Sequence, residues 1–202
     1  MMNIRSTVLT SLFAALIAAG AYISVPIGPV PITLQTFFIL TAGILGGRKI
    51  GVSAVFIYLI AGALGLPVFS GGTGSIAHFF GPTGGYLLAS IPAVYVTGIF
   101  SELGTKMYHL LFDQKAQMMR SVIVQTALVT VGTLLGSLIF YCIGVPWLKI
   151  VLQIDWGKAY GFGMGPFIIG DIIKMIAAIS LGSLFSGRVY DFLHMGVANE
   201  PA

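Results

Sequence analysis

The sequence predicts an all-α integral membrane protein, a bundle of six transmembrane helices with an outward-facing ligand cavity. Of the 202 residues, 57% are hydrophobic and only 8% are charged, whereas a soluble domain carries roughly 25% charged residues. Long uncharged apolar runs recur along the chain, as they do in membrane-spanning helices. Lysines and arginines gather in alternate connections between these runs, which is the pattern that orients membrane proteins.

Six apolar segments give the six predicted spans. They lie at about residues 7–25, 33–46, 50–66, 83–101, 121–144 and 166–187. The second, with roughly 14 residues, would reach only about 21 Å at 1.5 Å per residue, less than the roughly 30 Å hydrocarbon core. We therefore expect it to pack against longer neighbours or to carry part of its loop into the membrane. No linker divides the chain, so residues 1–202 are predicted to form a single membrane domain.

The basic residues predict which way the spans face. Six spans place most of them on one side of the membrane: Arg5, Arg48, Lys49, Lys106, Lys115, Arg120 and Arg188. Only Lys149 and Lys158 fall on the other side. By the positive-inside rule, both termini are predicted to be cytoplasmic in a multi-pass protein of the cell (plasma) membrane. The net charge of +4 is thus explained by topology in the lipid bilayer, and no nucleic-acid partner is predicted.

Three connections then face the outside, at residues 25–35, 69–88 and 145–166. The first two are free of charge, and the second is the glycine-rich stretch FSGGTGSIAHFFGPTGGYLL. Irregular backbone at membrane depth is tolerated only where it is buried in protein or lines a cavity, and glycine allows close packing and positive φ. These loops are predicted to be lids or walls of a cavity.

The last span carries two charges, Asp171 and Lys174, three residues apart on one helix face. A charge buried in the membrane costs about 2.5–3.5 kcal/mol on insertion scales, so both should pair or bind a ligand. One interpretation is a structural ion pair. The other is a ligand site in which Lys174 suits a carboxylate, while Asp171 suits N–H donors or Lys174 itself.

The start of the fourth span offers a second candidate site. Thr83 is placed to cap this helix before Gly84 and Gly85, and a helix start has free N–H groups and a partial positive charge that suit a carboxylate or carbonyl oxygen. The alternative is an ordinary capped helix. Four residues then share one face: Tyr86, Ser90, Ala93 and Thr97. This stripe suits a cavity wall and equally a helix-packing face.

Two further features leave alternatives open. Thr33 and Gln35 begin the second span after three prolines, where they could hydrogen-bond a ligand or cap the helix. The first span contains two overlapping pairs of small residues, and such pairs let another helix approach closely. The pairs are Ala14 with Ala18 and Ala15 with Ala19. The approaching helix could belong to this bundle or to a second protein.

Missing motifs limit the function classes. The sequence has no G-x-x-x-x-G-K-[ST] motif, so it cannot supply a P-loop ATPase. Its only cysteine is Cys142, and no group of His, Cys and carboxylate residues has metal-ligand spacing. No metal site, no cofactor and no catalytic set is predicted.

Four motifs in order carry a resemblance: GPVPITLQTF (28–37), GALGLPVFSGG (62–72), GPTGGYL (81–87) and GDIIK (170–174). Over about residues 7–187 the chain resembles the BioY family, the biotin-binding S components of energy-coupling-factor (ECF) vitamin transporters. The resemblance implies a six-helix protein that captures biotin from outside. It also implies a transmembrane coupling subunit and two ATP-binding subunits as partners, and makes the alanine pairs of the first span a docking face.

The resemblance also implies the site residues. The family's D-x-x-K motif falls on Asp171 and Lys174, and its glycine-rich loop and fourth-helix start fall on residues 81–86. Biotin's ureido N–H would bind Asp171, and Tyr86 with Phe79 or Phe80 would line its apolar part. No Lys or Arg lies between residues 49 and 106, so the ligand carboxylate would rest on Lys174 and neutral donors.

Three function classes compete. The first is a capture subunit that depends on an external ATPase. The second is a self-sufficient secondary transporter of biotin or another small carboxylate, in which Asp171 and Lys174 also couple protons. The third is a membrane-embedded enzyme. The missing catalytic set argues against the third class, and a single charge pair gives little for a proton relay.

Overall fold

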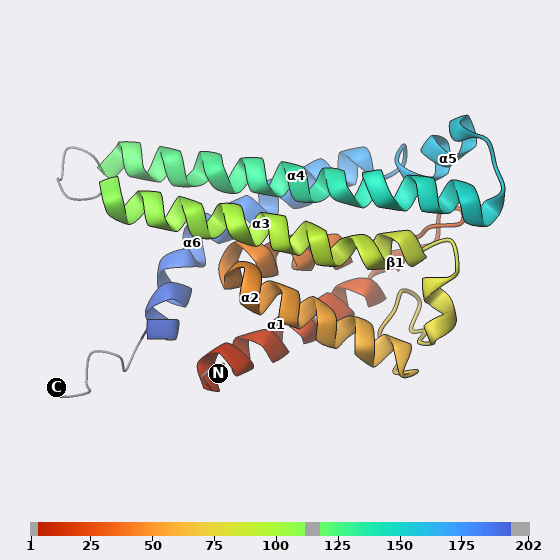
Figure 1. Cartoon of the computed structure of the whole chain (residues 1–202), viewed down its shortest axis with the longest axis horizontal. Coiled ribbons are helices and arrows are strands. Elements are labelled where there is room, and N and C mark those ends of the chain that lie inside the picture. Colours follow the sequence, from red (N-terminus) through yellow and green to blue (C-terminus); the bar gives the residue numbers. More distant parts are fainter. Residues whose placement is uncertain (1–3, 112–117, 195–202) are drawn as a thin grey trace.

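The computed structural model describes residues 4–111 and 118–194 and confirms an all-α membrane bundle (Figure 1). Its long helices are α1 (Ile4–Tyr22), α2 (Gln35–Ala63), α3 (Gly84–Leu111), α4 (Met118–Leu152) and α6 (Ile168–His194). All five are long and apolar enough to cross a membrane, and the chain is a multi-pass membrane protein. The short elements are the antiparallel pair β1 (Ser24–Val25) and β2 (Ile32–Thr33), the 3₁₀-helix η1 (Ile76–Phe79) and α5 (Trp156–Gly163).

A break at Gly47 divides α2 into two helical halves, residues 35–46 and 48–63. Gly47 has φ 66° and ψ −175°, a conformation that is essentially restricted to glycine. A β-carbon on Gly51 would lie 3.2 Å from the carbonyl oxygen of Ala42, whereas nine residues of straight helix span about 13.5 Å. The chain therefore turns back at Gly47. The two halves correspond in position to the predicted second and third spans.

A carboxylate from α3 closes this turn. The N–H of Arg48, the first residue after Gly47, donates to Glu102 Oε1 at 2.9 Å, and Arg48 Nε lies 3.2 Å from Glu102 Oε2. Glu102 thus caps the helix start that the break leaves open. Gly98 on α3 allows the approach, because a β-carbon there would overlap the backbone of Arg48.

The most extensive helix contact is between α3 and α4, where glycines on α4 face larger residues on α3. A β-carbon on Gly136 would lie 3.0 Å from the carbonyl oxygen of Ala93, and Thr97 Oγ1 donates to the carbonyl of Gly132 at 3.3 Å. Ser90, Ala93 and Thr97 are fully buried. These three residues of the predicted stripe therefore form a helix-packing face.

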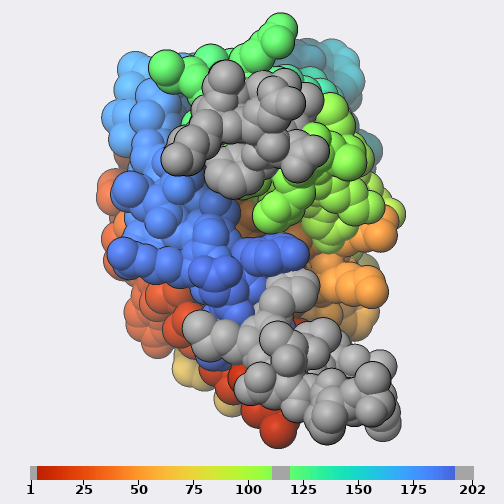
Figure 2. All heavy atoms as spheres, turned by 90° about the vertical axis from the view of Figure 1, so that its left-hand side faces the viewer, coloured from red at the N-terminus to blue at the C-terminus, as the bar shows by residue number. Residues whose placement is uncertain are grey.

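The two ends of the bundle differ. Figure 1 shows the connections after α1, α2 and α4 at one end, and the start of α1 with the end of α6 at the other. Figure 2 looks onto this second end, where α6 (blue) lies beside α1 (red) and α3 (green). The predicted spans place Arg5, Arg48, Lys49, Lys106 and Arg188 at this end; Lys115, predicted to join them, lies outside the described residues.

The last connection is more regular than predicted. We predicted a loop over residues 145–166, but α4 continues through Pro146 to Leu152 and α5 occupies Trp156–Gly163. That part of the prediction was wrong. A proline removes one backbone donor, and the helix continues past it because the apolar run does not stop there: Val145 and Leu148 are both buried.

Candidate ligand-binding site

A cavity lies at the end of the bundle where the connections gather. Residues before and at the start of α2, the glycine-rich connection, the starts of α3 and α6, and the middle of α4 line it. They are Val30, Pro31, Thr33, Gln35, Thr36, Phe69, Ser70, His78, Thr83, Tyr86, Leu87, Phe140, Tyr141, Phe167, Asp171 and Lys174. Its volume of about 80 Å³ is several times the roughly 10–15 Å³ that one water requires. A mostly apolar wall with a few convergent polar groups is typical of small-molecule sites.

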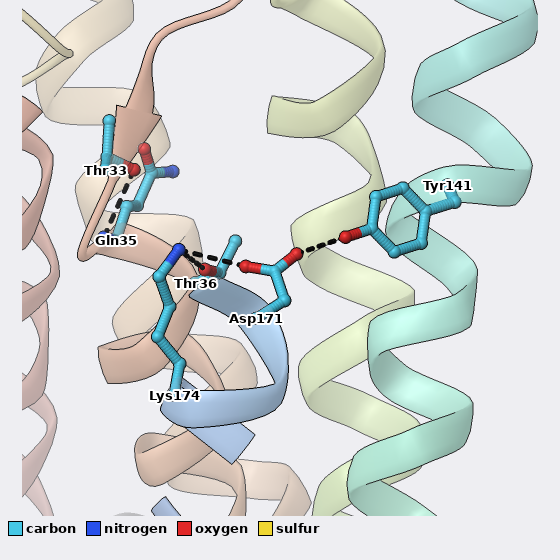
Figure 3. A network of polar contacts seen from close by, with 6 residues as sticks. All are labelled: Thr33, Gln35, Thr36, Tyr141, Asp171 and Lys174. Carbon is cyan, nitrogen blue, oxygen red and sulfur yellow. Dashed lines mark hydrogen bonds and ion pairs between the residues drawn. The ribbon is translucent and has the colours of Figure 1, made fainter. Parts of the chain in front are cut away.

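A chain of polar contacts crosses the cavity (Figure 3). Lys174 Nζ donates to Asp171 Oδ1 at 2.9 Å and to Thr36 Oγ1 at 3.3 Å. The hydroxyl of Tyr141 donates to Asp171 Oδ2. The side chains of Lys174 and Asp171 are only 10% and 17% exposed. Residues from α2, α4 and α6 therefore satisfy this pair, which offsets the cost of burying it.

The local sequence explains how α6 presents the pair. Asp171 lies in the first turn of α6, where its N–H donates to the carbonyl of Phe167 at 2.7 Å, and a carboxylate is favoured near a helix N-terminus. Lys174 follows one turn later, on the same face. Between them, Ile172 and Ile173 are exposed, so the polar face turns into the bundle and the apolar face turns out.

Tyr86 is held between three helices. Its ring fills the space left by Gly144 on α4, where a β-carbon would overlap the ring. Its hydroxyl donates to the carbonyl of Gly163 at the end of α5, at 2.7 Å. The position of α5 and the position of the Tyr86 ring are therefore linked.

The structure brings together six of the nine predicted ligand residues on the cavity wall. They are Thr33, Gln35, Thr83, Tyr86, Asp171 and Lys174. The hydroxyl of Thr33 also accepts from the N–H of Gln35, the first residue of α2, at 3.2 Å, although the N-cap residue of this helix is Leu34.

Gly84, Gly85 and Phe79 are not among the residues that line the cavity. A β-carbon on Gly84 would overlap the carbonyl of Phe79, and one on Gly85 would overlap Trp147. These glycines let α3 begin tightly against the loop and α4. The indole Nε1 of Trp147 donates to the carbonyl of Gly81 at 3.0 Å and holds the same loop. The Phe79 ring packs edge-on against Phe69, with ring centroids 5.9 Å apart, and supports the wall.

Sequence reasoning missed several wall residues, above all Tyr141. Its only local signal is a hydroxyl inside the apolar run IFYCIG, which does not say what the hydroxyl faces. Thr36 and His78 also lie on the cavity wall, and the sequence analysis gave neither of them as a ligand residue.

The two alanine pairs of α1 face different ways. Ala14 is 8% exposed and belongs to the core, and Ala18 packs partly buried against that core. Ala15 and Ala19 are exposed. One pair thus packs inside the bundle, and the other pair is left on its surface.

A bundle of apolar helices that holds a mostly buried, hydrogen-bonded charge pair in a cavity at one end defines a membrane protein that binds a small solute. The model of the BioY family matches residues 1–190, and the chain belongs to this family. The family consists of transport proteins, so the chain is a transport protein and not an enzyme.

Individual relatives agree over nearly the whole chain. A probable biotin transporter BioY of Pyrococcus horikoshii is 38% identical over 187 residues, which cover 93% of this chain and 99% of the relative. The biotin transporter BioY of Thermotoga maritima is 36% identical, with 86% of this chain and 91% of the relative covered. A crystal structure of the S-component for biotin from an ECF-type ABC transporter has a TM-score of 0.73 at 28% identity, with 91% and 92% coverage.

Proposed function

We propose that this protein binds biotin from the extracellular side and delivers it for uptake as the S component of an ATP-driven ECF transporter. The observation that carries the proposal is the Asp171–Lys174 pair in a cavity on a BioY-family chain. The names of the relatives support biotin as the ligand.

Biotin matches the chemistry of the cavity wall. Asp171 accepts an N–H of the ureido ring, and Lys174 pairs with the carboxylate. Thr83, Thr33 and Gln35 offer neutral hydrogen-bonding groups. Apolar side chains receive the thioether ring and the aliphatic chain: Leu87, Phe140, Phe167 and the ring of Tyr86. Phe80 is 72% exposed and is not among the residues that line this wall.

The ATP-binding subunits would act through a coupling subunit docked on α1. Ala15 and Ala19 are exposed with Ser11 one turn earlier, and this small-residue stripe lets a partner helix approach closely. A surface groove continues it toward the second half of α2, lined by Ser11, Val52 and Ser53 among others. The sequence has no P-loop of its own, which fits an external ATPase. A self-sufficient secondary transporter has less support, because one charge pair is a poor basis for a proton relay.

We propose that residues 1–202 form one domain of the plasma membrane, with both termini cytoplasmic. The support is the basic end of the bundle (Arg5, Arg48, Lys49, Lys106 and Arg188) opposite the cavity. Single cysteines in place of Ile76 and Lys106, in a Cys142→Ser background, should react with impermeant reagents from opposite faces. Reaction of both from outside would refute this orientation.

Two experiments test the function. Isothermal titration of the purified protein should detect biotin binding, and the absence of binding to folded protein would refute biotin as the ligand.

Reconstituted vesicles should take up biotin only with the partner subunits and ATP. Ala15→Trp and Ala19→Trp should leave binding intact and reduce that uptake, whereas buried Ala14→Trp serves as the control that damages the fold. Uptake without ATP would favour the secondary transporter.

A further inference from the structure

Asp171 is held from two helices. On α6, Lys174 donates to Oδ1 at 2.9 Å. On α4, thirty residues earlier in the chain, the hydroxyl of Tyr141 donates to Oδ2. Figure 3 shows the carboxylate between these two donors, with Thr36 drawn between Lys174 and Asp171 in this view.

Two donors from separate helices fix the carboxylate more firmly than one. With Lys174 alone, the Asp171 carboxylate could rotate about its bond to the β-carbon, and the flexible lysine could follow it. Tyr141 has a rigid side chain, and its ring is partly buried in the cavity wall. Each carboxylate oxygen can accept two hydrogen bonds, so each oxygen retains one acceptor site for a ligand.

We propose that Tyr141 is a positioning residue that orients the acceptor oxygens of Asp171 and so sets the preference of the cavity for ligands that present N–H donors. A carboxylate offers acceptor sites alone, and the hydroxyl of Tyr141 fixes the direction in which they point. A site built to accept from a ligand N–H discriminates against an analogue that lacks it, because the buried acceptor is then left unpaired. This inference rests on the proposed function, because the donors in question are the ureido N–H groups of biotin.

Tyr86 provides the matched control. It is a second tyrosine on the wall of the same cavity, but its hydroxyl donates to the carbonyl of Gly163. Tyr86→Phe removes a hydroxyl from the cavity without removing a donor to Asp171. Tyr86→Phe should change the affinities for all the ligands by the same factor, so the ratio of their dissociation constants should stay the same.

The experiment measures the dissociation constants of biotin and of its two ureido N-methyl derivatives, using wild type, Tyr141→Phe and Tyr86→Phe. Wild type should prefer biotin over the derivative whose methyl group replaces the N–H facing Asp171. Tyr141→Phe should reduce that preference by roughly two- to tenfold, the range of one hydrogen bond. A purely structural role for Tyr141 would weaken all three ligands equally.

The outcomes separate the inference from the proposed function. Wild type that binds none of these ligands would refute the proposed function. Biotin binding with the same preference in wild type and Tyr141→Phe would overturn the role of Tyr141 and leave the function standing. If Tyr141→Phe does not fold, Tyr141→Met replaces it, because a flexible methionine fills irregular space without supplying a comparable donor.

Discussion

Two ion pairs stand at opposite ends of the bundle and have different surroundings. Asp171 and Lys174 lie three residues apart on one helix, 17% and 10% exposed, on the wall of a cavity. Arg48 and Glu102 lie 54 residues apart on two helices, and their side chains are 45% and 36% exposed. The first pair is local and buried, and the second is long-range and half open to its surroundings.

The difference indicates what each pair does. Arg48 and Glu102 connect α2 to α3 and cap the helix that begins after Gly47, so the fold itself explains them. Such an exposed pair gains little from Coulomb attraction, about 0–1 kcal/mol, and the cap is the larger contribution. Asp171 and Lys174 lie on one helix, and their hydrogen bonds to Tyr141 and Thr36 connect α6 to α4 and α2. Unlike Arg48 and Glu102, they are mostly buried and lie on the wall of a cavity, as the proposed ligand site requires.

The largest expected effect comes from removing the buried cation. Lys174→Met should weaken biotin binding about ten- to a hundredfold, since a charge-assisted hydrogen bond contributes roughly 1.5–3 kcal/mol. The preference for biotin over its uncharged carboxamide should also largely disappear. Titration calorimetry with both ligands measures this. The double variant Asp171→Asn/Lys174→Met controls for an unpaired buried carboxylate, and exposed Lys158→Met should change nothing. An unchanged preference would move the ligand carboxylate to the start of α3, at Thr83–Gly85.

A smaller effect is expected at the opposite end. Glu102→Ala removes both the cap and the ion pair and should lower the free energy of unfolding by about 0.5–2 kcal/mol. Glu102→Gln keeps an acceptor oxygen for the N–H of Arg48 and should cost less. Unfolding in detergent measures both, and the biotin-to-carboxamide preference should stay at its wild-type value. A changed preference in Glu102→Ala would show that the two ends are coupled and would break the comparison.

The smallest effect is expected at the exposed pair, Asp155 and Lys158. Asp155 caps α5, and the hydrogen bond from the backbone N–H of Lys158 holds the pKa of its carboxyl below the usual value. Because this pKa is lowered by folding, the ionised Asp155 carboxylate stabilises α5 at any pH above the unfolded pKa of about 3.9. This stabilisation is lost as the pH falls through the folded-state pKa. The hydrogen-exchange protection of α5, corrected for the pH dependence of intrinsic amide exchange, should therefore fall only below about pH 4. Asp155→Asn, an equally good cap, should remove this pH dependence, and a persistent dependence would place the titrating group elsewhere.

The sequence predicted the parts of the site that depend on local motifs. Asp171 and Lys174 share a helix face because of their spacing, and Thr83 and Tyr86 lie at a helix start marked by glycine and proline. The contribution of Tyr141 depends on how α4 is rotated against α6, and no spacing within α4 encodes that rotation. The same limit applies to Glu102, whose partner lies 54 residues away.

The fold was also predictable from local patterns in the sequence, and the errors of that prediction have physical causes. Hydrophobic runs and charge asymmetry gave the spans, and the reversal at Gly47 agrees with the expected separation of the second and third spans. The regular structure after Pro146 was missed because the predicted fifth span ended at residue 144, whereas α4 continues to Leu152. The two alanine pairs of α1 share one spacing, so only packing against the core separates buried Ala14 from exposed Ala15.

The short first half of α2 also sets the electrical depth of the site. Its 12 residues, 35–46, span about 18 Å. If Arg48 and Lys49 mark one boundary of a hydrocarbon core of about 30 Å, Thr36 and the Lys174 ammonium beside it lie about 12 Å below the other boundary. An anion bound there would have crossed roughly 0.4 of the transmembrane field, about 0.9 kcal/mol per 100 mV. An inside-negative potential should then weaken biotin binding in oriented vesicles and spare its carboxamide, and a voltage-independent ratio would place the carboxylate nearer the surface.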